Sequence, residues 1–197
     1  MIERLKEFDA DFVLFVNGKH TPFLDSFFYT LSKMWVWIPL YVFLLFVVVK
    51  YFKKRTWLVL GCIAFLILIS DQFASGFLKN WVMRYRPSHN EEIGLKLHLV
   101  NGYAGGLYGF ISSHAANVFA LTSFLTFILK DVRLKWMLIL WCWATLVAFS
   151  RIYLGVHYLS DVLGGVISGV FFGWIVSKMF FIISAKSANR SNQKKYL

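Results

Sequence analysis

Charged residues are scarce in this 197-residue chain: they make up 16% of it, and only 10 of them are acidic. Soluble domains are about 25% charged and about 45–50% apolar, whereas 58% of this chain is hydrophobic. The composition therefore argues strongly against a water-soluble globular protein. In a soluble protein the formal net charge of +11 would indicate a nucleic-acid partner, so the positions of the cations decide what this charge means.

Cysteine is also rare. The two cysteines, Cys62 and Cys142, lie within apolar stretches, and they are too few and too isolated for a disulfide framework or a metal site. We expect both to be buried, unreactive thiols. A secretory signal peptide is not expected either, because charged residues between positions 3 and 11 interrupt any early apolar run.

Long apolar runs are abundant, and about 20 apolar residues are enough for a helix to cross the hydrocarbon core. The predicted spans are Met34–Val49, Trp57–Leu78, Ile111–Leu129, Trp136–Ser150 and Tyr158–Ile183. The sequence thus predicts an all-α protein, a polytopic membrane bundle of about five to six helices with no second domain. Gly165, Gly169 and Gly173 recur at every fourth residue of the last span, which lets a neighbouring helix approach closely.

Basic residues concentrate in two short connections and in the C-terminal tail. These cations are Lys50, Lys53, Lys54, Arg55, Lys130, Arg133, Lys135, Lys178, Lys186, Arg190, Lys194 and Lys195. By the positive-inside rule these segments are cytoplasmic, and residues 184–197 form a basic cytoplasmic tail. The connections at residues 79–110 and 151–157 then lie on the outer, periplasmic or extracellular face. Neither nucleic acid nor an obligate protein partner is expected.

Residues 1–33 form a separate N-terminal segment ahead of the predicted membrane domain at residues 34–183. Thr21 and Pro22 are typical of a helix start. The apolar residues behind them fall on one face: Phe23, Leu24, Phe27, Phe28 and Leu31. We expect an amphipathic helix lying in the outer interface; the alternative is a packed, tilted extra span.

The remaining polar residues collect on the outer side. The cations there are Lys79, Arg84, Arg86, Lys96 and Arg151, and the histidines are His89, His98, His114 and His157. Ionisable groups at the mouth of a membrane bundle are costly unless they pair or function, so they indicate a functional site. Asp71, deeper in the second span, is interpreted as a structural polar partner inside the bundle.

Lys79 and Arg86 are seven residues apart. If the second helix continues until Pro87 ends it near Arg86, the two side chains project from one face, two turns apart. Two cations without an acidic neighbour in sequence require an anion, and phosphate suits both a guanidinium fork and a lysine point charge. Arg151 could reach the same anion.

Ser112, Ser113 and His114 open the third span after a glycine-rich stretch, residues 102–109. Serines cap a helix, and its free N–H groups bind anions; the alternative is a capped helix with an interfacial histidine. His157 and Asp161 are at i and i+4, which predicts that they lie one turn apart on one helix face, so the carboxylate could orient the imidazole as a nucleophile or base. The alternative there is a structural polar pair.

Taken together, Lys79-(six residues)-Arg86-Pro87, Ser112-Ser113-His114 and Ser150-Arg151-(five residues)-His157-(three residues)-Asp161 resemble the signature KxxxxxxRP, PSGH and SRxxxxxHxxxD of the type 2 phosphatidic acid phosphatase family. The resemblance covers residues from about 71 to 175. The middle motif departs from it, because Ile111 replaces proline and Ser113 replaces glycine, which implies a slightly reshaped anion pocket. Membrane members commonly have six spans, so the five predicted here are a second departure.

The resemblance implies a catalytic mechanism. His157 attacks phosphorus to give a phosphohistidine, Asp161 holds its ring, and His114 protonates the leaving oxygen and then helps to activate water. The phosphate-binding residues it implies are Lys79, Arg86, Arg151, Ser112 and Ser113. No metal or other cofactor is expected, because three cations and a helix end supply the positive field and no cluster of carboxylates suits magnesium.

The predicted function is a multi-pass lipid phosphatase of the inner membrane with its site facing the periplasm. Undecaprenyl diphosphate is the first expectation for the substrate, and phosphatidylglycerol phosphate, phosphatidate and lipid A phosphate stay open. A non-catalytic channel or lipid-binding protein, whose outer cations only attract anions, is the alternative from another class. A vanadate-dependent haloperoxidase shares the signature, but that group is soluble and five apolar spans argue against it.

Overall fold

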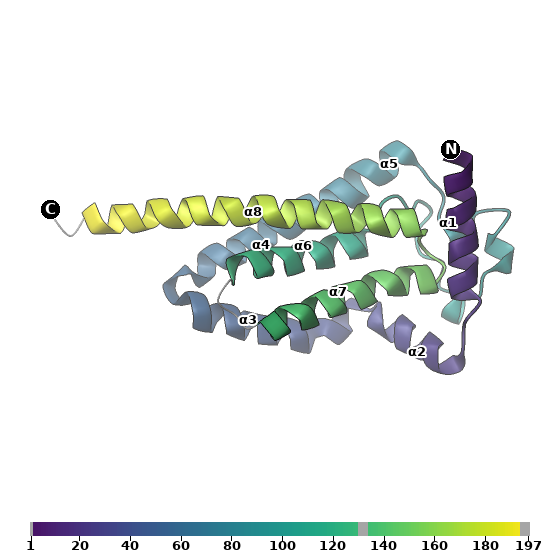
Figure 1. The fold of residues 1–197 in the computed structure, drawn as a ribbon, viewed down its shortest axis with the longest axis horizontal. Coiled ribbons are helices and arrows are strands. Elements are labelled where there is room, and N and C mark those ends of the chain that lie inside the picture. Colours follow the sequence, from purple (N-terminus) through teal and green to yellow (C-terminus); the bar gives the residue numbers. More distant parts are fainter. Residues whose placement is uncertain (1, 130–133, 194–197) are drawn as a thin grey trace.

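A computed structural model describes residues 2–129 and 134–193. Long antiparallel helices form the body of the protein (Figure 1). They are α3 (Ile38–Phe52), α4 (Thr56–Asp71), α6 (Ser113–Ile128), α7 (Leu134–Tyr153) and α8 (Leu159–Gln193). The all-α expectation is confirmed, and each of the five predicted spans corresponds to one of these helices.

Helical structure is continuous from Met34 to Val82, a stretch of 49 residues with the composition of a membrane span. It contains two of the predicted spans, because the chain reverses direction between α3 and α4 at Lys53, whose φ of 48° is left-handed. Lys135–Tyr153 and Leu159–Ser187 are also long and apolar enough to cross a membrane, whereas the apolar helix Ser113–Ile128 is shorter. The bundle is therefore that of a membrane protein.

The end of the second span differs from its prediction. A π-helical stretch, Gln72–Leu78, follows α4, and the short helix α5 (Lys79–Val82) ends where Met83 takes a left-handed conformation. Arg86 consequently lies beyond the helix, so the expectation that Lys79 and Arg86 project from one helix face is wrong. The chain ends the helix early because residues 84–86 pair with residues 107–109: Arg86 N donates to Leu107 O, and Gly109 N donates to Arg84 O.

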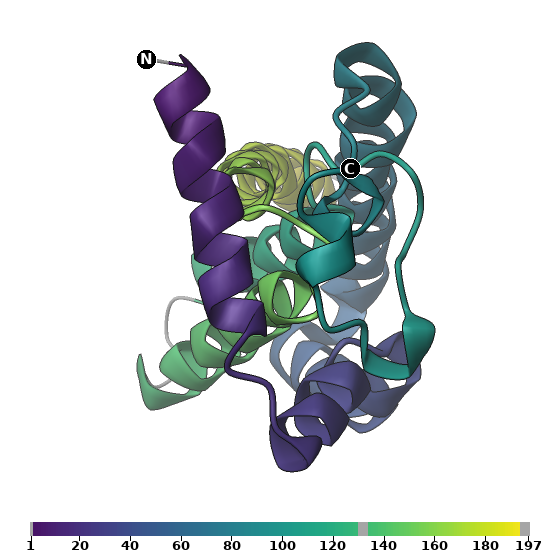
Figure 2. The same ribbon diagram turned by 90° about the vertical axis from the view of Figure 1, so that its right-hand side faces the viewer.

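The N-terminal segment contains two helices, α1 (Ile2–Asn17) and α2 (Pro22–Leu31). As predicted, Pro22 occupies the first turn of α2 and the Thr21 side chain accepts a hydrogen bond from Leu24 N at 3.2 Å. Helix α1 was not predicted. It lies across the end of the bundle (Figures 1 and 2) and buries Asp9, Val13 and Asn17 against the bundle.

Helices α6 and α8 pack closely through the predicted glycine stripe. A Cβ on Gly165 would lie 2.6 Å from Ser112 O, and one on Gly169 would lie 2.4 Å from Ala116 O. Glycine therefore lets the two backbones touch. The consequence for the site is that the first turns of α6 and α8 are held side by side, and Ser112 N donates to Asp161 O at 2.9 Å.

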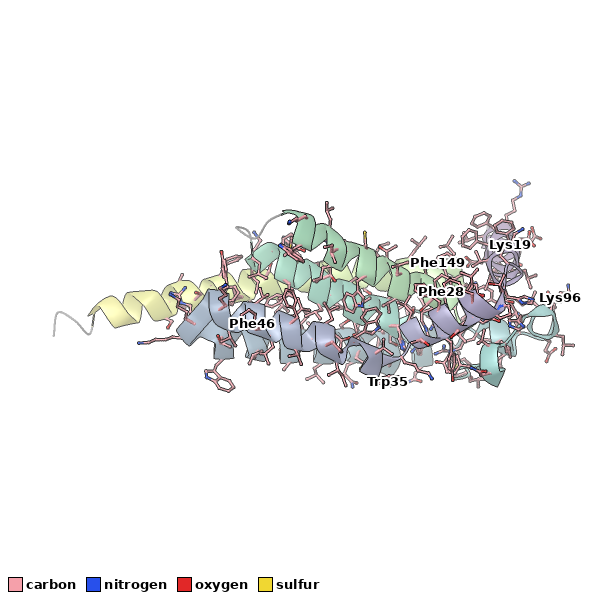
Figure 3. All side chains as sticks on the ribbon, turned by 90° about the horizontal axis from the view of Figure 1, so that it is seen from below. Lys19, Phe28, Trp35, Phe46, Lys96 and Phe149 are labelled. Atoms are coloured by element: carbon pink, nitrogen blue, oxygen red, sulfur yellow. The ribbon has the colours of Figure 1, made fainter. Side chains whose placement is uncertain are left out.

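Apolar side chains cover the flanks of the bundle, as a bilayer requires. Trp35 and Phe46 point outward, whereas Lys19 and Lys96 lie at the end that carries α1 (Figure 3). Cys62 is buried as predicted, but Cys142 is exposed. That prediction was wrong because α7 turns part of its apolar surface outward, and there a thiol needs no protein neighbours.

Helix α8 does not end with the predicted span at residue 183 but continues to Gln193. The cytoplasmic position of the basic tail stays a prediction. Several of the cations behind the predicted orientation fall outside the described residues or have side chains that do: Lys130, Arg133, Arg190, Lys194 and Lys195.

Candidate active site

The three sequence motifs meet in one cavity of about 340 Å³ at the end of the bundle that carries α1. Its lining includes six of the predicted site residues: Lys79, Arg86, Ser113, His114, Arg151 and His157. They come from α5, the loop before Pro87, α6, α7 and the loop before α8. Antiparallel packing brings these segments together, because each crosses or leaves the bundle at the same end.

His157 lines the cavity and is almost completely enclosed, with 1% of its surface exposed. It lies in the loop before α8, which begins at Leu159, so the expectation that it shares a helix face with Asp161 is wrong. Its Nδ1 is 3.5 Å from Asp161 Oδ2, and its Nε2 is 3.1 Å from Arg86 Nη1. A guanidinium can only donate hydrogen bonds, so this contact places the lone pair on Nε2 and the proton on Nδ1, toward Asp161.

The charge state of His157 follows from the same surroundings. Burial holds the pKa of His157 well below its usual range, and the positive charges of Arg86, Arg151 and Lys79 lower this pKa further. The imidazole is therefore neutral at physiological pH, and its Nε2 lone pair faces Arg86, which lines the same cavity. A neutral imidazole oriented by a carboxylate is chemically suited to attack an electrophile or to accept a proton.

Asp161 is fully buried behind His157 in the first turn of α8 and does not line the cavity. Its Oδ2 accepts the backbone N–H of Tyr158 at 3.0 Å, which fixes the carboxylate on the side of the His157 ring. This bond is half of a capping box, in which an acidic residue of the first turn accepts from the N-cap N–H. The helix start therefore positions the carboxylate.

Arg86 and Arg151 supply buried positive charge. Arg86 donates through Nε to Tyr108 O at 3.1 Å, and Gly105 leaves room for its head group: a Cβ there would lie 2.7 Å from Nη1. Arg151, 1% exposed, donates to the Tyr103 hydroxyl at 2.8 Å. Among the described residues, neither guanidinium forms an ion pair with a carboxylate. Buried cations without acidic partners favour a bound anion.

Lys79 contacts the residue that departs from the family motif. Its Nζ donates to Ser113 Oγ at 2.6 Å, and Ser113 Oγ is also 2.8 Å from Ser75 Oγ. The serine therefore reshapes the pocket through its hydroxyl, which ties the lysine to α6. Asp71 lines the same cavity and accepts a hydrogen bond from Asn117 Nδ2 at 3.3 Å, and its structural role stays a prediction.

Ser112 and His114 differ in whether their side chains reach the cavity. Ser112 is the N-cap of α6, as predicted, and its hydroxyl accepts from Ala115 N at 3.5 Å. It is fully buried and does not line the cavity, so the structure does not bring its side chain to the anion site. His114 lies in the first turn of α6 and lines the same cavity as His157.

Two residues behind the site, Asp9 and Arg84, have contacts that the sequence did not predict. Arg84 was identified from the sequence only as one of the outer cations, but its Nη1 donates to Asp161 Oδ1 at 3.0 Å and its Nη2 to Asp9 Oδ2 at 2.9 Å. Asp9 is 2% exposed. An acidic residue at the centre of an amphipathic helix was the available signal, but its partner is 75 residues away in sequence.

A family pattern matches most of this bundle. The pattern of the PAP2 superfamily matches residues 56–184, which include every helix that lines the cavity except the short 3-10 helix Met34–Trp37 and α3. The chain belongs to the PAP2 superfamily. The resemblance drawn from the three motifs is confirmed, and the expectation of a membrane phosphatase is confirmed with it.

Two curated relatives in the PAP2 superfamily align over nearly the whole chain. The lipid A 4'-phosphatase of Porphyromonas gingivalis is 36% identical over 180 residues, covering 91% of this chain and 75% of the relative. The lipid A 4'-phosphatase of Bacteroides thetaiotaomicron is 37% identical over 195 residues, covering 96% of this chain and 83% of the relative.

Solved PAP2 structures share the fold. A transmembrane PAP2 phosphatidylglycerolphosphate phosphatase from Bacillus subtilis has a TM-score of 0.65 at 22% identity, covering 89% of this chain and 86% of that one. LpxE from Aquifex aeolicus has a TM-score of 0.64 at 24% identity, covering 85% of this chain and 93% of that one. The architecture is therefore that of membrane PAP2 enzymes.

Three potential metal ligands gather outside the cavity, namely His20, Asp25 and His98, which we call the His–Asp clasp. The rings of His20 and His98 stack with centroids 3.9 Å apart and planes 13° apart. Parallel stacked rings cannot both point a nitrogen at one ion, because a metal lies close to the plane of each imidazole that binds it. In this arrangement the clasp joins the N-terminal segment to the outer loop, through a contact of 2.8 Å between His98 Nε2 and Asp25 Oδ2.

Proposed function

We propose that this protein hydrolyses a phosphate monoester of a membrane lipid through a phosphohistidine formed on His157. The observation that carries the proposal is the position of the neutral His157 imidazole in a cavity lined by Lys79, Arg86 and Arg151. The cations attract the phosphoryl group and neutralise charge that develops on its oxygens in the transition state. The neutral imidazole supplies the electron pair that attacks phosphorus.

The proposed reaction has two steps. In the first, His157 Nε2 forms a bond to phosphorus while the bond to the lipid oxygen breaks, and His114 donates a proton to that oxygen. In the second, His114 accepts a proton from water, water oxygen bonds to phosphorus and the bond to Nε2 breaks. Asp161 stabilises the His157 ring while it carries the phosphoryl group. Free phosphate and the lipid alcohol are the products.

An apolar cavity of about 420 Å³ adjoins the polar one and supports a lipid as substrate. The two cavities share Met34, Tyr41, Asn117 and Val118. The apolar cavity continues between α3, α4, α6 and α7 along side chains such as Leu44 and Leu125. A phosphate head group at His157 would therefore place an attached hydrocarbon chain against apolar side chains.

Lipid A phosphate is the substrate class that we favour. Two relatives that are 36% and 37% identical to this chain are lipid A 4'-phosphatases. Undecaprenyl diphosphate, the first expectation from the sequence, stays a prediction, as do phosphatidylglycerol phosphate and phosphatidate. We place the enzyme in the inner membrane with its cavity facing the periplasm, because the short basic connection at Lys53 and Arg55 lies at the opposite end of the bundle.

A phosphate-release assay in detergent tests the proposal. The purified protein is given lipid A, undecaprenyl diphosphate, phosphatidylglycerol phosphate and phosphatidate in separate reactions, and each reaction is repeated with His157→Ala. His89→Ala is the matched control, because His89 is a histidine of the outer loop that does not line the cavity. We expect release from lipid A that is lost in His157→Ala and kept in His89→Ala.

Two results would contradict the proposal. Equal phosphate release by His157→Ala and the unmodified protein would refute the phosphohistidine intermediate. Absence of phosphate release from all four lipids would refute the lipid phosphatase activity. Preferential phosphate release from undecaprenyl diphosphate would contradict lipid A phosphate as the favoured substrate but would agree with phosphoryl transfer to His157. Binding of these lipids without turnover would instead support the non-catalytic alternative.

A further inference from the structure

The N-terminal helix α1 reaches the catalytic machinery through a buried network of charges. Asp9 of α1 and Asp161 of α8 both bind one guanidinium, that of Arg84, at 2.9 Å and 3.0 Å. The side chains of Asp9 and Asp161 are 3% and 0% exposed, and that of Arg84 is 25% exposed. We propose that Asp9 and Arg84 are positioning residues for Asp161, and that α1 thereby fixes the carboxylate that orients His157.

The geometry divides the two oxygens of Asp161 between two tasks. Oδ1 accepts from Arg84, and Oδ2 accepts from Tyr158 N and faces His157 Nδ1 at 3.5 Å. The Arg84 guanidinium also lies over the Tyr158 ring, 4.0 Å from its centroid. Arg84 thus holds both the carboxylate and the residue that follows His157 in the chain, which restrains the position of the imidazole from two sides.

Asp9 also caps the helix that carries Asp161. The N-cap of α8 is Tyr158, whose side chain cannot accept a hydrogen bond from the first-turn N–H groups in the manner of serine or aspartate. Asp9 Oδ1 accepts the Ser160 N–H at 3.0 Å instead, and Ser160 Oγ donates to Asp9 Oδ2. A carboxylate near a helix N-terminus is also favoured by the helix dipole. Helix α1 therefore supplies a cap that α8 lacks in its own sequence.

The charges explain why two carboxylates share one arginine. One positive guanidinium between two negative carboxylates leaves one negative charge uncompensated. That charge is available to the His157 ring when the ring becomes cationic on binding phosphorus. If Asp9 lost its charge, Arg84 would neutralise Asp161 completely, and the ring would lose electrostatic support in the reaction while the lipid-binding surface stayed unchanged.

The test uses charge-removing variants of the full-length protein. Asp9→Asn keeps an oxygen that can accept from Ser160 N but removes the charge, and Arg84→Gln removes the bridge. Asp11→Asn is the matched control on α1, because Asp11 is exposed on the same helix. Lys96→Gln is the control for loss of an outer cation, since Lys96 is exposed (Figure 3). Turnover and KM are measured on the lipid with which the unmodified protein releases most phosphate.

We expect kcat to fall about 10-fold in Asp9→Asn and about 100-fold in Arg84→Gln, with KM changed by less than about twofold. The double variant should be no slower than Arg84→Gln alone, because both changes act through Asp161. Rapid-quench measurement of phosphohistidine should show the same loss in the rate of its formation. The two controls should retain the kcat of the unmodified protein.

Three outcomes would overturn the inference. Asp9→Asn could match Asp11→Asn in kcat, Arg84→Gln could raise KM with kcat unchanged, or the two losses could multiply in the double variant. If Arg84→Gln does not fold, Asp9→Asn and Arg84→Lys decide by the same criteria. The inference rests on the proposed function, and His157→Ala separates the two: turnover without His157 refutes the proposed function, whereas an inactive His157→Ala with an unaffected Asp9→Asn refutes only this inference.

Discussion

Replacing Gly169 by alanine should separate α6 from α8 and thereby disturb the site. A Cβ at this position would lie 2.4 Å from Ala116 O and 2.9 Å from Ala120 N, both backbone atoms of α6. Ordinary van der Waals contact begins at 3.4 Å, so the two helices must move apart by about 1 Å. Backbone atoms cannot rotate away as a flexible side chain does, so the movement involves whole helices.

The magnitude follows from two opposing contributions. Overpacking of this kind costs about 1–3 kcal/mol, whereas alanine in place of glycine favours a helix by about 1 kcal/mol. We therefore expect Gly169→Ala to lower the free energy of unfolding by up to about 2 kcal/mol, and by about 1–3 kcal/mol relative to a glycine-to-alanine change that meets no neighbour. Because α6 carries His114 and α8 carries Asp161, a shift of about 1 Å between them should also lower kcat by about 10-fold or more.

Gly61→Ala is the matched control. Gly61 lies in α4, and a Cβ there would meet no atom within 4 Å. Only the helix-propensity gain then applies, so this variant should be as stable as the unmodified protein or more stable, with unchanged kcat. Thermal unfolding in detergent and phosphate release measure the two effects. The reasoning would be refuted if Gly169→Ala were as stable and as active as Gly61→Ala.

Three further predictions concern the site and the His–Asp clasp. Ser113→Gly restores the family residue and frees Lys79 Nζ from its 2.6 Å contact, so we expect a change in KM of about threefold or more with little loss of stability, checked by steady-state kinetics and thermal unfolding. Burial raises the pKa of Asp25, but hydrogen bonds from Tyr153 and His98 outweigh it and hold the pKa below its ordinary value. Asp25→Asn should therefore be less stable than the unmodified protein at pH 7, and the difference should shrink as the pH falls below about 4, where the unmodified protein also loses this ionised carboxylate; a constant difference in thermal unfolding across that range would contradict it. Phosphate release should persist after chelation of divalent cations and be inhibited by vanadate, whereas strict dependence on added magnesium would contradict the proposed chemistry.

Much of the fold could be predicted because apolar length, basic connections and glycine spacing are local properties of the sequence. The five helices lie where the apolar runs are, and Gly165 and Gly169 contact α6 as their spacing indicated. The helix that was expected to continue to Arg86 ends at Val82, because pairing of residues 84–86 with residues 107–109 competes with helix propagation. Such pairing depends on the tertiary arrangement and leaves no periodic signal.

The residues that line the cavity were more predictable than the residues that hold them in place. His157, His114 and the cations could be found because ionisable residues are unexpected in an apolar chain. The role of Arg84 could not, since its partner Asp9 lies 75 residues away on a helix that periodicity did not reveal. Ser112 could not be assigned from its motif alone, because the hydroxyl of a serine before a helix can bind either an anion or a backbone N–H group of the helix. In this structure the hydroxyl accepts a hydrogen bond from the backbone.

The apolar cavity beside the polar one determines how the concentration of substrate should be expressed. Because the two share Met34, Tyr41, Asn117 and Val118, a lipid whose phosphate reaches His157 keeps its hydrocarbon chains among apolar side chains and neighbouring lipids. The encounter then takes place within the plane of the bilayer. The quantity that governs saturation is the mole fraction of the phosphorylated lipid in that plane, so dilution by neutral lipid slows the reaction at constant bulk molarity.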